Sequence, residues 1–371
     1  MHIGYYVHLH GSGHAQRAKT IAQHLTIPIT FIGTGVSQQN WEGVDNYQLL
    51  DIPTDVVESI PDLPINQNCQ TYSFHYAPYY SPHHRERAIA IATWVQQTNP
   101  TAVIVDVSAE ISQYLRFLGV PVIGVRQHGD RSDFPHLCGY SAAYKLLAPF
   151  PQLLESPGVP NWIVDKTIYT PGFSRYSPQT ITKSAARVKL QIPQKQKVVL
   201  VLNGKGGGKH SLSKIAAAAA TPQWLWLIVG EIRRDIHDLP SNISVLGWCN
   251  DTYIYLKAAD VAIASGGHNT VMEIGTAGIP FLCIPESRPF KEQKVKAQLL
   301  ENLGLSFTAQ TFPDSVEIEL ILEKLTKLDV SRWKQIIAVD GAAQTAQVIE
   351  SEVKLLANIQ NSLNKHLSSK F

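Results

Sequence analysis

The segment that most constrains the fold lies between residues 261 and 284. An apolar run, Val261 to Ala264, is followed by Ser265 and the glycine pair Gly266 and Gly267. A helical pattern then extends from Asn269 to Ala277 and ends at Gly278, a helix stop signal. Phe281 to Ile284 is a second apolar run, typical of a buried strand. This order predicts strands joined by a helix, the repeating unit of an α/β fold.

The glycine turn predicts a phosphate site. A helix that begins at such a turn leaves backbone N–H groups unpaired beside the positive end of its dipole. Asn269 and Thr270 add side-chain donors there, and Glu273, one turn further in, could accept the hydroxyls of a ribose. After Pro285 a predicted polar loop carries Glu292 and Gln293, which could bind a group beyond the phosphates. The alternative is an ordinary strand–helix–strand unit with Glu273 in solvent.

These residues resemble the donor-binding signature of GT-B nucleotide-sugar glycosyltransferases. The RPFKEQ ending is similar to that of the family 28 C-terminal-domain type, the family of the undecaprenyl-pyrophosphoryl-muramyl-pentapeptide N-acetylglucosaminyltransferase. The resemblance implies two Rossmann-like α/β domains facing across a cleft, with a C-terminal helix crossing back to the first domain. It implies an acceptor domain over residues 1–172, a donor domain over 173–350 and a returning helix over 351–371.

The resemblance also assigns roles to single residues. It implies a diphosphate site at Ser265, Gly267, His268, Asn269 and Thr270, a ribose acid at Glu273, and a donor-sugar pair at Glu292 and Gln293. It implies a uracil site at Trp248 and Cys249, and a glycine loop over the diphosphate at Gly204, Gly206 and Gly207.

That glycine loop follows the predicted strand Lys197 to Leu202 and is not a Walker A loop. Asn203 stands where its first glycine belongs, and His210 follows Lys209 in place of Ser or Thr. An ordinary flexible turn remains the alternative.

In the first half, a strand from His2 to Leu9 leads into His-Gly-Ser-Gly-His and a helix that starts near Ala15. This segment does not match a dinucleotide-binding fingerprint. Gln16 stands at the position of the third glycine, and no acidic residue ends the next predicted strand, Ile29 to Gly33. The turn resembles the N-terminal glycine motif of the GT-B group, which faces the acceptor. A helix start favours a neutral imidazole, so His14 is a candidate general base; a capping role is the alternative.

Asp106 ends the apolar strand Thr101 to Val107, where ligands of parallel sheets collect. In small-molecule relatives, an acid in this region orients the catalytic histidine, and Asp106 is the candidate for that part. The alternative is an N-cap for the predicted helix Ser108 to Phe117.

A long irregular segment is expected from Gln38 to His83. Its aromatic run, Tyr72 to Tyr76, could line an acceptor pocket, contact a membrane surface, or pack the loop. The chain is also expected to be irregular between Ile168 and Gln196, which is interpreted as the interdomain connection.

Composition narrows the class of protein. The 371 residues suffice for two domains, and a formal net charge of +2 gives no reason to expect nucleic acid as a partner. The 4 cysteines form no CxxC pair, which favours reduced thiols. No charged leader and no long apolar run is evident, so a cytoplasmic protein is expected, possibly in peripheral contact with the inner face of a membrane.

The predicted activity is inverting, metal-independent transfer from a UDP-hexose or UDP-N-acetylhexosamine to a hydroxyl of a small-molecule, glycan or lipid-linked acceptor. Helix N-termini and loop amides would stabilise the departing UDP, in line with the absence of an Asp-x-Asp motif. No cofactor is expected besides the UDP-sugar donor. Two other classes stay open: a nucleotide-sugar hydrolase or 2-epimerase of the same fold, and a non-catalytic nucleotide-sugar binder.

Overall fold

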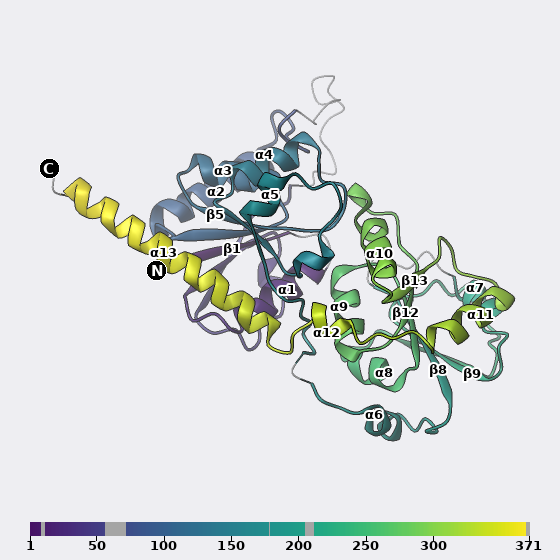
Figure 1. Cartoon of the computed structure of the whole chain (residues 1–371). Helices are drawn as coiled ribbons and strands as arrows, with labels where there is room; N and C mark the ends of the chain where they lie inside the picture. Colours follow the sequence, from purple (N-terminus) through teal and green to yellow (C-terminus); the bar gives the residue numbers. More distant parts are fainter. Residues whose placement is uncertain (9–11, 56–71, 178, 205–210, 369–371) are drawn as a thin grey trace.

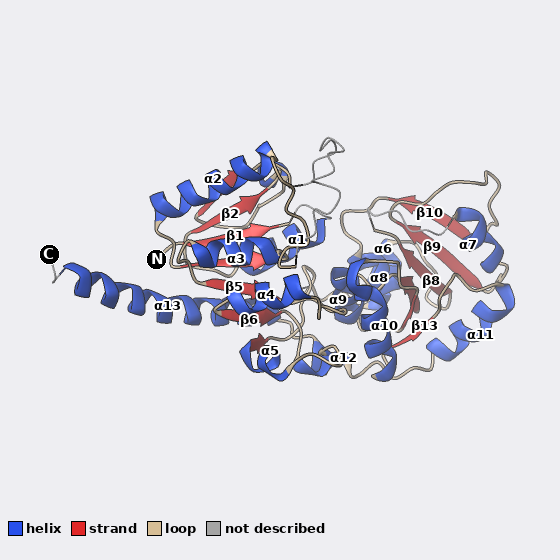
Figure 2. Ribbon diagram, turned by 90° about the horizontal axis from the view of Figure 1, so that it is seen from above, coloured by secondary structure: helices blue, strands red, loops and turns tan. Residues whose placement is uncertain are grey.

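The computed structural model describes the chain except for residues 9–11, 56–71, 178, 205–210 and 369–371. It contains two parallel β-sheets, each with helices on both faces (Figures 1 and 2). One sheet is built from the first half of the chain and the other from the second half. The predicted α/β class with two Rossmann-like units is confirmed.

The first sheet has the strand order β3-β2-β1-β4-β5-β6-β7. Its strands are β1 (Ile3–Val7), β2 (Ile29–Gly33), β3 (Tyr47–Asp51), β4 (Ala102–Asp106), β5 (Val122–Val125), β6 (Lys145–Ala148) and β7 (Thr167–Tyr169). The associated helices are α1 (Ser12–Ala22), α2 (Pro82–Thr98), α3 (Ala109–Phe117), α4 (Phe134–Ala142) and α5 (Asn161–Lys166). Side chains alternate between two cores: Tyr5 packs into one face of the sheet and Tyr6 into the other.

The second sheet has the order β10-β9-β8-β11-β12-β13. Its strands are β8 (Lys197–Leu202), β9 (Trp224–Val229), β10 (Ile243–Gly247), β11 (Val261–Ala264), β12 (Phe281–Cys283) and β13 (Ser306–Thr308). The helices of this half are α6 (Lys183–Lys189), α7 (Leu212–Ala218), α8 (Tyr253–Ala258), α9 (His268–Ala277), α10 (Glu292–Asn302), α11 (Ser315–Leu325) and α12 (Trp333–Ile336).

Both sheets reverse their strand order at a comparable point. In the first sheet, β1 and β4 are neighbours, with Val7 opposite Asp106. In the second, β8 and β11 are neighbours, with Leu202 opposite Ala264. A ligand crevice is expected outside the carboxyl ends of the strands at such a switch point. The fold therefore places the Gly13–His14 turn beside Asp106, and the end of β8 beside the end of β11, which Ser265 follows.

The last helix, α13 (Gly341–Ser368), returns to the first domain. Ala346, Ile349 and Val353 are buried on it together with residues of α1 and β1. Glu350 accepts hydrogen bonds from the backbone and side chain of Thr26 (N···O 2.6 Å). Both views show the far end of α13 projecting past the first domain (Figures 1 and 2). The predicted return crossing is present, and the helix that makes it already begins at Gly341.

Three expectations about local structure were wrong. The irregular segment from Gln38 contains the edge strand β3, and the irregular connection contains helix α6. Glu292 and Gln293 do not lie in a loop, because they form the first turn of α10. Among the described residues, no helix has the length and apolar character needed to cross a membrane.

Candidate active site

His14 and Asp106 meet at the switch point of the first sheet. His14 lies in the first turn of α1, and its Nδ1 is 2.9 Å from Oδ1 of Asp106 at the end of β4. Asp106 is fully buried, and Arg17, one turn after His14, donates to both of its oxygens (Nε···Oδ2 3.0 Å). Arg17 is also buried. Ser108, and not Asp106, caps helix α3 by accepting from the Ile111 amide, so the capping alternative for Asp106 was wrong.

The charges around Asp106 determine which form of His14 faces the cleft. Burial alone would raise the pKa of Asp106, but Arg17 and His14 hold it well below its usual value. The carboxylate is therefore ionised and can only accept, so the proton of a neutral His14 ring lies on Nδ1. Arg17 Nη2 also lies 3.1 Å from that nitrogen, but it donates to Oδ1 of Asp106 as well, so the carboxylate remains the acceptor for the Nδ1–H. Nε2 of His14 is then left as the basic atom, which is what a general base requires.

The N-terminus of α9 lies against this dyad from the second domain. Asn269 Nδ2 donates to the Gly13 carbonyl (3.1 Å), directly before His14. Gly267 is the N-cap of α9 and provides no side-chain cap, so the first amides of the helix are open to an anion. A Cβ at Gly267 would have Ser265, Thr270 and Gln293 as its nearest neighbours, between 3.8 and 4.0 Å away. The structure thus brings the predicted diphosphate residues together.

Glu273 is held by partners from its own half of the chain. Arg175 Nε donates to Oε1 of Glu273 (3.0 Å), and Thr252 Oγ1 donates to Oε2 (3.4 Å). Burial raises the pKa of Glu273, and the nearby Arg175 charge opposes that rise. Thr252 lies just beyond Trp248 and Cys249, so the predicted base site and ribose acid are adjacent. A ribose on Glu273 would replace Arg175 as its partner.

Gln293 and Glu292 point to different neighbours. Oε1 of Gln293 accepts from the amides of Gly266 (3.1 Å) and Glu286 (2.8 Å), which fixes the turn before α9. Glu292 instead contacts Arg131 of the first domain (3.5 Å). Gly204 follows β8, and a Cβ there would meet nothing within 4 Å, so this position is open to a ligand. Gly206 and Gly207 lie outside the described residues.

A group of buried basic side chains surrounds the same region. His128 and Lys296 are each 1% exposed, and neither side chain has a hydrogen-bond partner among the described residues. The His128 ring lies 6.3 Å from that of His268, the first residue of α9. Burial lowers the pKa of Lys296 to about 8. Burial, with the Lys296 and Arg17 charges, lowers the pKa of His268 well below its ordinary value, so this ring is neutral.

A large apolar cavity opens in the first domain beside the dyad. Its volume is about 900 Å³. The lining is mainly apolar or aromatic and comes from α2, α3, β4, β5, α4 and the segment Phe74 to Ala77. Val105 and Val107 on either side of Asp106 belong to it, as does His8. Phe74, His75 and Tyr76 of the aromatic run therefore line a cavity, whereas Tyr72 does not; a role of this cavity in binding the acceptor stays a prediction.

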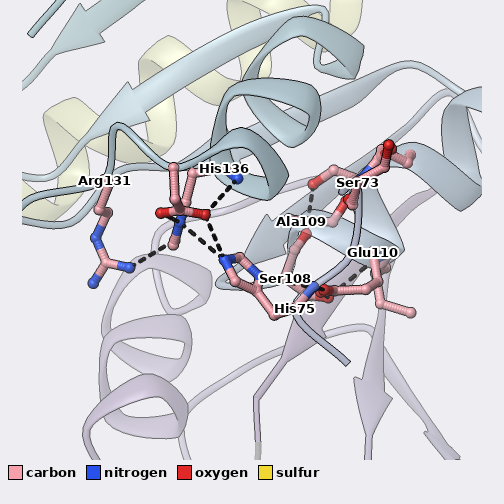
Figure 3. Close-up of polar contacts among 11 residues, drawn as sticks. Ser73, His75, Ser108, Ala109, Glu110, Arg131 and His136 are labelled. Atoms are coloured by element: carbon pink, nitrogen blue, oxygen red, sulfur yellow. Dashed lines mark hydrogen bonds and ion pairs between the residues drawn. The ribbon is translucent and has the colours of Figure 1, made fainter. Parts of the chain in front are cut away.

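At the edge of this cavity lies the one group in the described residues with metal-ligand spacing, His75, Asp133 and His136, whose ligand atoms lie within 4.8 Å of one another. Figure 3 shows His75 between Glu110 and His136. Burial lowers the pKa of His75, but the carboxylates of Glu110 and Asp133 outweigh it and raise the value overall. Its two ring nitrogens lie 3.2 and 2.9 Å from those carboxylates, so a protonated ring is fully paired.

The contacts of His136 indicate whether this cluster is suited to bind a metal ion. Arg131 Nη1 is 2.9 Å from His136 Nε2 and can only donate, so the His136 proton lies on Nδ1 and is given to Asp133 (2.6 Å). Burial, together with Arg131, lowers the pKa of His136 to about 4. A metal-bound histidine normally gives its second N–H to an acceptor, which a guanidinium cannot be. The residues fit a chain of ion pairs and hydrogen bonds better than a metal centre.

Arg17, Arg175 and the full extent of the cavity were not among the predicted site features. Arg17 could have been found, because it lies one helical turn after His14 and faces the same side of α1. Arg175 and Arg131 are distant in sequence from Glu273 and Glu292, and no local pattern connects them. The cavity is assembled from elements far apart in the chain, so no single segment indicates it.

The chain forms two parallel α/β units whose switch points are in contact. One unit bears an open helix N-terminus and the other a buried acid–histidine dyad. This arrangement of two units is the GT-B class of glycosyltransferase folds. The structure of MurG from Acinetobacter baumannii has the same fold, with a TM-score of 0.63 at 16% identity, covering 94% of this chain and 99% of that one.

Sequence comparison finds a family likeness in the second half of the chain. Residues 230–353 match the glycosyltransferase family 28 C-terminal domain. An uncharacterized glycosyltransferase of Methanosarcina acetivorans is 31% identical over 121 residues, which cover 31% of this chain and 32% of that relative. A UDP-N-acetylglucosamine--N-acetylmuramyl-(pentapeptide) pyrophosphoryl-undecaprenol N-acetylglucosamine transferase of Acetivibrio thermocellus is 26% identical over 183 residues, 46% of this chain and 48% of the relative. The matched regions thus span less than half the length of either relative.

Proposed function

We propose that this protein is an inverting glycosyltransferase that moves a sugar from a UDP-hexose or UDP-N-acetylhexosamine to an acceptor hydroxyl. The observation that carries the proposal is the His14–Asp106 dyad beside the uncapped N-terminus of α9, joined by the Asn269–Gly13 hydrogen bond. Amides at that helix end can hold a diphosphate, and Nε2 of His14 can take the proton of an attacking hydroxyl. Two findings support the donor: residues 230–353 match the family 28 C-terminal domain, and the name of one relative includes UDP-N-acetylglucosamine.

The chemistry assigned to the chain is a single displacement. His14 removes the acceptor proton while the oxygen attacks the anomeric carbon from the side opposite the diphosphate, which inverts that carbon. Asp106 and Arg17 hold the His14 ring in the required tautomer. The α9 amides stabilise the charge that develops on the leaving UDP, the part that a metal ion has in other glycosyltransferases. We therefore propose that transfer needs no metal.

The apolar cavity supports an acceptor with a sizeable apolar body. The lining is apolar over most of its area but also includes charged side chains such as Asp55, Arg87 and Glu110, so the substrate could carry polar groups besides the hydroxyl directed at His14. Tyr72, Tyr79 and Tyr80 near its border are between 59% and 75% exposed. Such tyrosines also suit a membrane surface, which is consistent with a lipid-linked acceptor and peripheral contact.

The test combines binding with turnover. UDP binding is measured by calorimetry, and a panel of UDP-sugars is incubated with apolar alcohols and phenols in buffer containing EDTA. We expect UDP to bind, product to form only with an acceptor, and the product to have the anomeric configuration opposite to the donor by NMR. His14→Gln should keep UDP affinity and lower kcat by roughly 10²–10⁴-fold.

Other outcomes identify the rival functions. UDP release or sugar isomerisation without an acceptor would indicate the hydrolase or 2-epimerase. UDP-sugar binding that His14→Gln leaves intact, with no turnover in either protein, would indicate a binding protein. A dependence on added divalent metal would contradict the metal-independent mechanism.

A further inference from the structure

Phe290 belongs to the second half of the chain, but its ring forms part of the cavity in the first domain. The ring meets His136 edge-on at 4.5 Å and His75 at 5.4 Å between centroids. The guanidinium of Arg131 lies 5.1 Å from the Phe290 centroid. These three partners are among the side chains labelled in Figure 3. The Phe290 ring, which comes from the donor domain, thus forms part of the wall of the cavity in the first domain.

The backbone at this point is held in an unusual conformation. Phe290 (φ 56°, ψ 24°) and Lys291 (φ 53°, ψ 26°) are consecutive non-glycine residues in the left-handed region. Such residues persist only where their surroundings fix them, and they concentrate at functional sites. Here the Phe290 carbonyl accepts from the Asp130 amide (2.7 Å). Gly129 lies so close that a Cβ there would be 2.5 Å from the same carbonyl oxygen.

The same turn leads directly to the donor side. Lys291 is followed by the first turn of α10, where Gln293 accepts from the Gly266 amide. Gly266 precedes the α9 N-terminus, where the diphosphate is proposed to lie. A short covalent and hydrogen-bonded path therefore connects the Phe290 ring to the phosphate turn. A shift of the Gly266 turn on donor binding would move α10 and, with it, the ring at the cavity.

We propose that Phe290 is a positioning residue that couples the two substrates, so that a bound nucleoside diphosphate tightens the cavity around an apolar acceptor. The inference rests on the proposed function and adds to it a residue through which the two substrates affect each other's binding. The ring covers the acceptor, Gln293 links it to the phosphate turn, and Asp130 and Gly129 hold the Phe290 backbone against the first domain.

The experiment measures the coupling directly. Binding of 1-naphthol, a fluorescent apolar hydroxyl compound, is titrated on the full chain with and without saturating UDP, and UDP is titrated by calorimetry with and without 1-naphthol. In the wild-type protein UDP should tighten 1-naphthol binding by about fivefold or more, and 1-naphthol should tighten UDP binding by the same factor. In Phe290→Ala both factors should fall to about one, while UDP affinity without 1-naphthol stays within about twofold of the wild type.

Arg288→Ala is the matched control, because Arg288 lies in the same loop, is 44% exposed and forms an ion pair with Glu286. It should keep the wild-type coupling. Phe290→Leu retains apolar bulk without the ring and should show intermediate coupling, and it carries the test if Phe290→Ala does not fold.

The outcomes separate this inference from the proposed function. Unchanged coupling in Phe290→Ala and Phe290→Leu overturns the inference and leaves the transferase proposal intact. A wild-type protein that binds UDP but not 1-naphthol overturns it as well, because the cavity then takes no such ligand. A wild-type protein without UDP affinity rejects the proposed function itself.

Discussion

At the residue scale, the most demanding feature is the fully buried carboxylate of Asp106. A buried charge is tolerated only when it is paired and hydrogen-bonded, and Asp106 has Arg17 on both oxygens and His14 on one. The same pairing that orients the His14 ring therefore also contributes to folding. The proposed catalytic geometry and the stability of the fold therefore both depend on the Asp106 carboxylate.

Asp106→Asn should lower the free energy of unfolding by roughly 3–5 kcal/mol, because Arg17 would keep its buried charge without a counter-charge. The pKa of Asp106 is depressed in the folded state, so its stabilisation is present above the unfolded pKa of about 4 and is lost only as the pH falls through the folded value. Urea unfolding at neutral pH measures the loss. Asp130→Asn, 53% exposed at the carboxylate, is the control and should change little. Equal stabilities of the two variants would contradict the assignment.

In contrast to Asp106, Lys296 is expected to lower the stability of the fold at neutral pH, because it is buried without a partner among the described residues. Its pKa is about 8 in the folded state and 10.5 in the reference state. Between these values the unfolded chain binds more protons, so stability should rise with pH, by roughly 3 kcal/mol in all from this group. Lys296→Met should be more stable than the wild type at pH 7 and should lack that rise.

The control for Lys296→Met is Lys294→Met, at an exposed position of the same helix. Its pH profile of unfolding should follow that of the wild type. A wild-type protein whose stability is flat between about pH 8 and 10 would mean that an anion partner of Lys296 exists in solution.

At the element scale, the start of α10 supports the start of α9. Gln293 is 4% exposed, and its single carbonyl oxygen accepts two backbone amides. Gln293→Ala should cost roughly 1–3 kcal/mol of stability, because it leaves buried N–H groups unsatisfied. Gln298→Ala removes an exposed side chain from the same helix, where it bonds only Asn302, and should cost much less by urea unfolding. From the sequence alone, Gln293→Ala was expected to spare UDP affinity, and the contact with Gly266 now predicts that it weakens UDP binding too.

The elements that could be predicted are the buried parallel strands and the glycine-bounded helices. β2, β8, β9 and β11 were predicted with the observed limits, since a continuous apolar run between turn residues marks a strand covered on both faces. β3 was missed because four of its five residues are exposed, as at a sheet edge. The start of α10 was missed because left-handed Lys291, without a side-chain cap, precedes it.

The candidate site was predictable where its residues are local in sequence. The turn from Ser265 to Thr270 and the dyad partners His14 and Asp106 could be found from strand ends and glycine turns, and the structure brings them together; their functional roles stay predictions. Arg175, Arg131 and Phe290 act across long sequence separations. Their positions depend on how the two domains meet, which no local pattern records.

At the scale of the whole molecule, α13 joins the end of the second domain to the core of the first. Ile349, 1% exposed, packs among residues of α1 and the first sheet. Ile349→Ala should lower the free energy of unfolding by roughly 2–5 kcal/mol by creating a cavity. Leu355→Ala, on the half-exposed side of the same helix, should cost far less. If both variants lose the same stability by urea unfolding, the returning helix is not part of the core of the first domain.

The chain passes between the domains twice, and the two passages are bonded to each other. Gly172 donates to the Ile336 carbonyl (2.7 Å) and accepts from the Ala338 amide (3.1 Å). A Cβ at Gly341 would lie 2.8 Å from the Gly172 carbonyl oxygen, so the passages are also closely packed. Because hydrogen bonds join the two passages, we expect them to bend together about a common axis. A twist of one domain against the other would instead break these hydrogen bonds. We therefore expect the space between His14 and α9 to open mainly in one direction.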